Sequence, residues 1–121
     1  MRWILDSRAV PTFEEARAAL RAFVDERDWD QFHDPKDLAL SVAIEAGELV
    51  EIFQWRAAAK LSEDERARVA EELADVAMYC MLLADKAGVD LPAAVIDKLA
   101  KNRAKYPVEK ARGRADKYNR L

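Results

Sequence analysis

Cysteine, histidine, glycine and proline are all scarce in this chain. The single cysteine, Cys80, cannot form an intrachain disulfide and has no CxxC partner, which excludes a disulfide framework and a CxxC redox or zinc motif. The three glycines leave long uninterrupted stretches, and the four prolines stand beside expected helix ends. This distribution is typical of an all-α protein, and the cysteine content makes the cytoplasm the expected location.

Long apolar runs and an excess of one charge are also missing. The longest apolar stretch, residues 76–84, is far shorter than the roughly 20 residues of a membrane helix. The N-terminus turns acidic at Asp6 before a signal-peptide core develops. A net charge of -3 argues against a general binder of nucleic-acid polymers. With 121 residues, 51% of them hydrophobic, the chain has the length of one folded domain, residues 1–121.

Capping signals predict four helices. Thr12 with Glu15 and Ser62 with Glu65 have the spacing of capping boxes, and Gly88 is a natural left-handed helix end. Counted with their flanking residues, the expected helices span residues 12–28, 34–59, 62–88 and 90–105. A basic tail is expected from about residue 107. Because no segment shows sustained strand alternation, the sequence predicts a four-helix bundle.

Acidic side chains lie in or beside the apolar seams of the second and third expected helices. In the second, Glu45 falls in line with apolar residues at spacings of three and four, and Glu48 lies only about 60° around the helix from it. In the third, Glu72 and Asp75 lie at the edge of the seam, whereas Glu71 points farther out. The chain therefore carries an ExxE motif and an ExxD motif.

One such pair on an amphipathic helix is usually a solvated face. Two pairs beside the seams of consecutive antiparallel helices would converge, and four like charges repel unless a cation neutralises them. Oxygen ligands favour a hard cation such as Mg²⁺. A di-iron bundle and a zinc site are disfavoured, because the only histidine, His33, lies in an expected loop.

Aromatic and polar side chains alternate in the loop between the first two expected helices. The loop reads Trp29, Asp30, Gln31, Phe32 and His33. Stacking surfaces mixed with hydrogen-bonding groups suit recognition of a base and sugar, whereas core filling is the alternative for Phe32. Trp55 and Tyr79 are the other aromatic candidates, and Tyr79 is either core or the wall of a pocket.

Basic side chains concentrate at the C-terminal end. Residues 98–121 carry nine basic and two acidic side chains, against 11 and 21 in residues 1–97. On the fourth expected helix Lys98, Asn102 and Lys105 share one face, beside Arg103. This face either meets phosphates or is a solvated cationic helix end, and the sequence leaves both open.

Four segments of the chain resemble one known family. They are residues 26–33, 45–55, 71–79 and 98–107, in that order along the chain. Together they are similar to the MazG-like all-α nucleoside triphosphate pyrophosphohydrolases, and within them to the dCTP pyrophosphatase branch. The resemblance implies an oligomeric MazG fold that holds Mg²⁺ on Glu45, Glu48, Glu72 and Asp75. It also implies nucleotide binding by residues 29–33, Trp55 and Tyr79, with Lys98 and Asn102 near the phosphates or sugar.

The resemblance implies cleavage of a nucleoside triphosphate between its α and β phosphates, giving a monophosphate and pyrophosphate, in cleaning or balancing the nucleotide pool. The expected substrate is dCTP or a modified cytosine nucleotide. At the position where dCTP-branch members can present a histidine from the first helix, this chain has Leu20, so dUTP and a non-canonical purine triphosphate remain alternatives.

A homo-oligomer is expected, with a tetramer favoured over a dimer, and only Trp3 and the apolar content support it independently. The competing hypothesis is a non-enzymatic helical oligomerisation or partner module. In that case the acids would be solvated and the aromatic side chains would fill the core. The position of Glu45 within an apolar seam argues against it.

Overall fold

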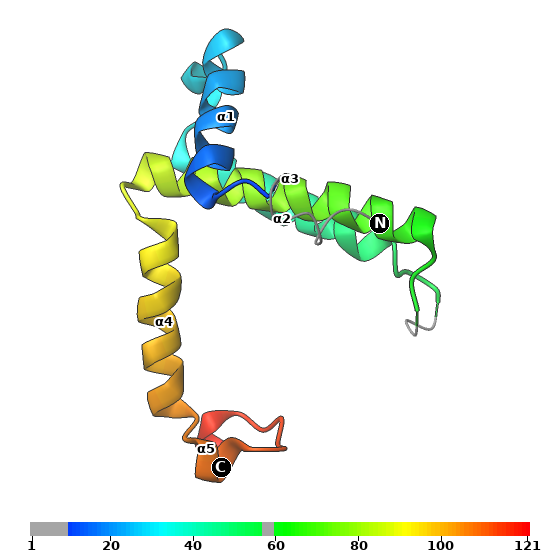
Figure 1. The fold of residues 1–121 in the computed structure, drawn as a ribbon, viewed down its shortest axis with the longest axis vertical. Helices are drawn as coiled ribbons and strands as arrows, with labels where there is room; N and C mark the ends of the chain where they lie inside the picture. Colours follow the sequence, from blue (N-terminus) through cyan, green and yellow to red (C-terminus); the bar gives the residue numbers. More distant parts are fainter. Residues whose placement is uncertain (1–9, 57–59) are drawn as a thin grey trace. The chain divides into compact units, whose positions relative to one another are not determined.

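The fold is known from a computed structural model, which describes residues 10–56 and 60–121 (Figure 1). These residues form helices and turns, so the all-α prediction is confirmed for them. The chain divides after Ala87 into two compact units, which are described separately. None of the described helices is long and apolar enough to cross a membrane.

Helix α1, Phe13–Glu26, begins at the expected capping residue. The Thr12 hydroxyl accepts a hydrogen bond from the Glu15 backbone N–H at 3.1 Å, which satisfies a donor that the first helical turn leaves free. The helix ends two residues before the expected position. Asp28 then takes a left-handed conformation, φ 53°, and the chain enters a short 3₁₀ turn, η1, Asp30–Phe32.

Helix α2, Pro35–Glu51, is shorter than the sequence predicts. Its start is as expected, with Asp34 as the cap, but the expected end near residue 59 is wrong. Trp55 has φ 63°, which a continuing helix does not allow. After this turn, the Arg56 guanidinium donates to the Lys60 carbonyl and pairs with Glu65, contacts that helix propensity alone does not predict. Residues 57–59 of the expected helix lie outside the described residues.

Helix α3, Glu63–Ala87, has both predicted ends. The Ser62 N–H donates to the Glu65 carboxylate at 2.9 Å, and the Glu65 N–H donates to the Ser62 hydroxyl at 3.2 Å. This reciprocal pair is the predicted capping box. Gly88 follows the last helical residue with φ 68°, a conformation that glycine adopts without a steric penalty.

The core of the first unit lies where its three helices meet. Val24 of α1, Leu38 of α2 and Leu82 of α3 are buried against one another, and half-buried Leu20 and Tyr79 pack on them. Helices α2 and α3 lie side by side and run in opposite directions (Figure 1). Side chains of the two helices that face each other can therefore meet in one site.

The second unit contains helix α4, Leu91–Lys105, which is capped by Asp90. The expected basic tail, from about residue 107, contains the short helix α5, Val108–Ala111, and the 3₁₀ turn η2, Tyr118–Arg120. The rings of Tyr106 and Tyr118 meet edge to face with their centroids 6.2 Å apart, which orders the end of the chain against α4. The four expected helices thus divide between two units, with three in the first and one in the second.

Candidate metal and nucleotide site

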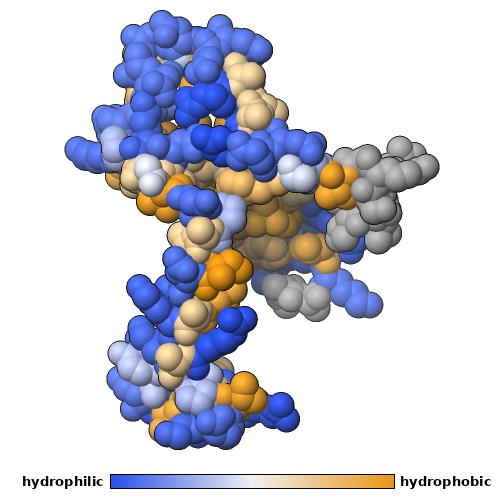
Figure 2. Space-filling model, turned by 60° about the vertical axis from the view of Figure 1, so that its left-hand side comes forward, coloured by the Kyte–Doolittle hydropathy of each residue, from blue (hydrophilic) through white to orange (hydrophobic). Residues whose placement is uncertain are grey.

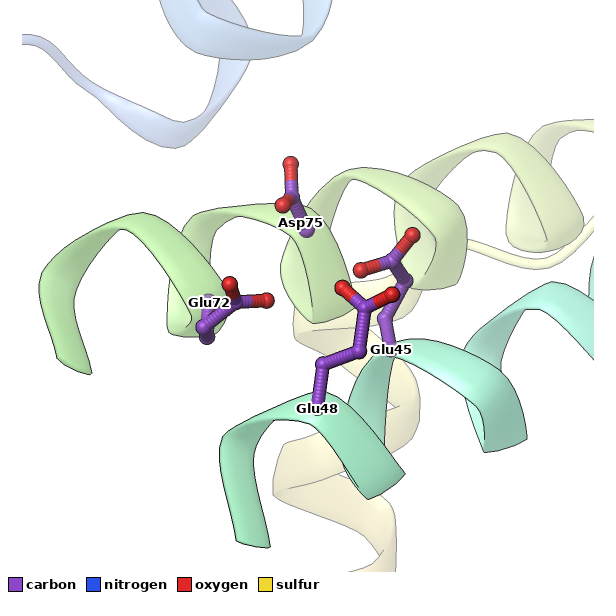
Figure 3. A group of neighbouring side chains, drawn as sticks. All are labelled: Glu45, Glu48, Glu72 and Asp75. Carbon is purple, nitrogen blue, oxygen red and sulfur yellow. The ribbon is translucent and has the colours of Figure 1, made fainter. Parts of the chain in front are cut away.

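The structure brings together the four acids of the ExxE and ExxD motifs. Glu45 and Glu48 project from α2 toward Glu72 and Asp75 of α3 (Figure 3). Each side chain offers one carboxylate oxygen, and these oxygens all lie within 4.8 Å of one another. We call these four residues the acid cluster. Within each helix, a spacing of three residues places both acids on the same side. The two pairs meet because these sides of α2 and α3 face each other.

Two oxygens of the acid cluster are shielded from water and have no hydrogen-bond donor. They are the Oε2 atoms of Glu45 and Glu72. Glu72 is half-buried while its neighbour Glu71 is exposed, as the helical spacing predicts. A shielded polar atom without a hydrogen-bond partner is unfavourable for the folded state. A ligand that satisfies these oxygens would recover that cost.

The cluster shifts the pKa values of its own carboxyls. The pKa of Glu45 rises from 4.5 to about 7, first because Glu45 shares a hydrogen bond with Glu48, then through burial and the charges of the other acids. Burial, followed by the charges of Glu48 and Asp75, also raises the pKa of Glu72. The charges of the neighbouring acids thus contribute to both shifts, after the hydrogen bond in Glu45 and after burial in Glu72.

This set of donors fits a hard divalent cation. The acid cluster contains carboxylate oxygens only, without nitrogen or sulfur ligands. Oxygen ligands of this kind suit Mg²⁺, Ca²⁺ or Mn²⁺ better than zinc. The like charges and the two unpartnered oxygens would be neutralised by such an ion, so the acid cluster is a candidate metal centre.

The aromatic segment between α1 and α2 forms the η1 turn and exposes much of its apolar surface. Trp29 is 45% exposed, and its ring forms an edge-to-face pair with that of Phe23, with centroids 5.6 Å apart. Phe32 is 66% exposed, so it does not fill the core. Two aromatic surfaces are thus available for stacking in this turn.

The polar residues of this turn are engaged to different degrees. The carboxylate of Asp30 accepts hydrogen bonds from Arg21 and Lys86. The Gln31 side-chain amide donates to the backbone carbonyl and the carboxylate of Asp28. His33 is half-buried and its Nδ1 atom has no partner. The His33 ring therefore keeps a free hydrogen-bonding position, whereas Asp30 is already paired.

The remaining candidates lie elsewhere in the chain. Trp55 follows α2 and is 94% exposed, whereas Tyr79 is half-buried against the core. Lys98 and Asn102 belong to the second unit, where both line a shallow groove on α4. Leu20 also packs on the core of the first unit, so its side chain is part of the hydrophobic contact between α1 and α3.

Comparison with known proteins identifies the family of this chain. The model of the MazG-like family matches residues 40–121, a segment that contains all four members of the acid cluster. The chain belongs to the MazG-like family. The match also includes α4 of the second unit, so both units of the MazG-like chain carry residues of the family pattern.

Several proteins of known name or structure are similar to this MazG-like chain. It is 47% identical to dCTP pyrophosphatase 1 of Rattus norvegicus and 44% identical to that of Homo sapiens. In both cases the alignment covers 92% of this chain and 68% of the relative. A crystal structure of a pyrophosphatase from Archaeoglobus fulgidus is 43% identical, with a TM-score of 0.68 over 78% of this chain and 91% of that one.

Sequence reasoning missed a group of ion pairs in the MazG-like chain. They join α1, η1 and the end of α3, and involve Arg17, Arg21, Asp30, Asp85 and Lys86. We call these five residues the ion-pair cluster. The spacing of four between Arg17 and Arg21 was the only local signal, because the partner acids are distant in sequence. No pattern in the sequence specifies such long-range pairs.

Proposed function

We propose that this MazG-like chain is a metal-dependent hydrolase that cleaves dCTP, or a modified cytosine deoxynucleotide, between the α and β phosphates. The products are the nucleoside monophosphate and pyrophosphate. The observation that carries the proposal is the acid cluster, in which four carboxylates converge and two of their oxygens lack any donor. The chain also shares 44–47% identity with enzymes named dCTP pyrophosphatase 1.

The acid cluster is the proposed Mg²⁺ site. Glu45, Glu48, Glu72 and Asp75 would hold the ion through carboxylate oxygens. When bound, Mg²⁺ supplies charge neutralisation for the triphosphate and lowers the pKa of a bound water. The unpartnered oxygens of Glu45 and Glu72 and the raised pKa values of both groups support this assignment.

The acid cluster also contains a carboxyl suited to proton transfer. The pKa of Glu45 rises to about 7, first through its hydrogen bond with Glu48 and then through burial and the charges of the other acids. A carboxyl whose pKa lies close to the working pH can accept a proton from a water and release it again. We propose that one of the four acids of the cluster is the general base.

The aromatic residues of the first unit are the proposed base-binding surfaces. Trp29, directly before η1, Phe32 of η1 and the exposed Trp55 offer flat apolar faces. The half-buried His33, whose Nδ1 atom has no partner, is the proposed hydrogen-bonding residue beside them. Tyr79 is the proposed wall between core and nucleotide. For Lys98 and Asn102, contact with the phosphates or sugar stays a prediction.

A homo-oligomer completes the proposed enzyme, with a tetramer favoured. Large apolar side chains of α2 and α3 are exposed, and they comprise Leu40, Ile44, Val50, Leu73 and Met78. Figure 2 shows apolar residues, in orange, reaching the surface beside charged ones. Surfaces of this kind mark sites of association. Trp3, which supports the same prediction, lies outside the described residues. Cys80 is a free thiol, consistent with the proposed cytoplasmic setting.

The deciding experiment is product analysis on a panel of nucleoside triphosphates, with Mg²⁺ and with a chelator. We expect Mg²⁺-dependent release of monophosphate and pyrophosphate, fastest for dCTP or a cytosine analogue. A maximum for dUTP or a purine triphosphate would keep the reaction and correct the base. No turnover of any triphosphate by folded protein would overturn the proposal and favour the non-enzymatic partner module.

Glu71→Gln is the matched control for Glu72→Gln. The two acids are adjacent on α3, but only Glu72 belongs to the acid cluster, while Glu71 is exposed. We expect Glu71→Gln to keep wild-type turnover and Glu72→Gln to lose it. Equal turnover in the two variants would remove the acid cluster from the reaction.

A further inference from the structure

The ion-pair cluster ties the aromatic η1 turn to two helices at once. One carboxylate oxygen of Asp30 accepts from Arg21 of α1 at 3.1 Å, and the other accepts from Lys86 of α3 at 3.0 Å. Asp30 is the only residue of the η1 turn with hydrogen bonds between side chains to both α1 and α3 among the described residues. Its carboxylate thus fixes the turn against both helices.

Arg21 extends the cluster to a second carboxylate. Its guanidinium also donates to Asp85 of α3 at 3.4 Å, while Arg17 donates to the other oxygen of Asp85 at 2.7 Å. The side chain of Asp85 is 18% exposed, and that of Arg21 is 29% exposed. Partly buried, multiply bonded charges hold their geometry better than single pairs on an open surface.

Helix α3 connects this cluster to the acid cluster. Asp75 and Asp85 stand ten residues apart on α3, which corresponds to about 15 Å along the helix axis. Because a helix is stiff over this length, a turn fixed to the end of α3 is also fixed relative to Asp75. The packing of the turn provides less restraint, since Trp29 and Phe32 are 45% and 66% exposed.

We propose that Asp30, Arg21 and Lys86 are positioning residues that set the distance between the aromatic turn and the acid cluster. The inference rests on the proposed function, in which the turn binds the base and the acids act at the phosphates. A nucleotide held at both ends needs this distance to be constant before it binds. Asp30 then contributes to substrate binding through the placement of Trp29 and Phe32 and needs no contact of its own with the nucleotide.

The test compares Asp30→Asn with Asp25→Asn. Both carboxylates lie beside Arg21, with its Nη1 atom 3.1 Å from Asp30 Oδ1 and 3.7 Å from Asp25 Oδ1. Each variant therefore removes one negatively charged neighbour of the same guanidinium. Only Asp30 belongs to the turn, since Asp25 is a neighbour of Arg21 within α1. For Asp30→Asn we expect KM for dCTP to rise about tenfold, with kcat within about twofold of wild type. Asp25→Asn keeps both values.

Lys86 supplies a second pair of variants from the other helix. Lys86→Met keeps the apolar stem of the side chain and removes its charge, so KM rises as in Asp30→Asn. Lys86→Arg keeps a donor for Asp30 and restores KM toward wild type. A change in kcat alone, or equal KM values for Asp30→Asn, Lys86→Met and wild type, would overturn the inference.

Hydrogen exchange separates this inference from the proposed function, because it requires no turnover. The N–H groups of Phe32 and His33 donate within the turn to the carbonyls of Trp29 and Asp30. We expect both amides to exchange faster in Asp30→Asn and Lys86→Met than in Asp25→Asn. If no triphosphate is hydrolysed by the wild type, the proposed function fails while this result still decides the positioning role. Unchanged exchange would overturn it.

Discussion

Helix α3 takes part in two groups of charged side chains that differ in composition. The acid cluster joins its Glu72 and Asp75 to two acids of α2, without any basic partner in the cluster. The ion-pair cluster, about ten residues farther along, joins its Asp85 and Lys86 to side chains of α1 and η1. Two acids meet three bases there, so the charges nearly cancel.

The contrast distinguishes a group whose charges are paired within the protein from a group that contains acids only. In the ion-pair cluster the Lys86 ammonium, hydrogen-bonded to Asp30, is the main cause that lowers the pKa of that carboxyl. In the acid cluster the pKa of Glu45 rises to about 7. Opposite shifts in carboxyl pKa values identify which group lacks its counter-charge.

The largest expected effect is on turnover. Glu45→Gln and Asp75→Asn each remove a carboxylate from the acid cluster, and we expect each to lower kcat by at least about 100-fold with the fold retained. Asp85→Asn, a neutralised acid on the same helix but outside the acid cluster, is expected to keep kcat within about twofold. Steady-state kinetics with circular dichroism on each variant tests the distinction, which is lost if Asp85→Asn is as inactive as Asp75→Asn.

Addition of Mg²⁺ is the next largest effect. An ion that binds only the folded state at ten times its Kd raises stability by about 1.4 kcal/mol, or about 5 °C in Tm. We expect this rise in the wild type and in Asp30→Asn, but not in Glu45→Gln. Thermal denaturation with MgCl₂ and with chelator measures it. A rise that survives Glu45→Gln would place the ion elsewhere.

Removal of one charge should have opposite consequences in the two clusters. Without metal, Glu72→Gln relieves repulsion among the acids and raises Tm. Asp85→Asn leaves Arg17 and Arg21 short of a carboxylate and lowers stability by about 1 kcal/mol. Thermal denaturation of both variants and the wild type in chelator gives the sign of each change in Tm. Two changes of the same sign would contradict the comparison.

The smallest expected effect is a pH dependence of stability in the metal-free protein. The pKa of Glu45 is about 7 in the fold against 4.5 as a free side chain, so the folded state binds more protons between these values. Stability is therefore greatest below about pH 4.5 for this group and falls as pH rises through about 7. Tm should drop by a few degrees from about pH 5 to about pH 8. Glu45→Gln should flatten the profile, and an unchanged drop in that variant would assign it to another group.

Local sequence patterns were sufficient for the parts of the structure that depend on neighbours in the chain. The capping box of Ser62 and Glu65 and the left-handed Gly88 bound α3 as predicted. The proximity of Glu45 and Glu48 follows from a spacing of three in a helix, and their meeting with α3 follows from the hairpin of two consecutive helices.

Features that depend on contacts across the chain could not be predicted in this way. The residues after Glu51 have good helix propensity, but Arg56 reaches Lys60 and Glu65 and the helix ends early. Asp30 has the sequence context of a ligand-binding residue, whereas its partners Arg21 and Lys86 become visible only when α1 and α3 meet. Contacts of this kind leave no periodic pattern in the sequence from which they could be predicted.

The early end of α2 affects the fluorescence expected of Trp55. Trp55 is left in a left-handed conformation with 94% of its side chain in water. An indole in that environment emits at long wavelength, and its emission moves toward the blue when an apolar surface covers it. The indole at the end of α2 is therefore a fluorescent indicator that would report, in real time, any apolar surface that comes to cover this position.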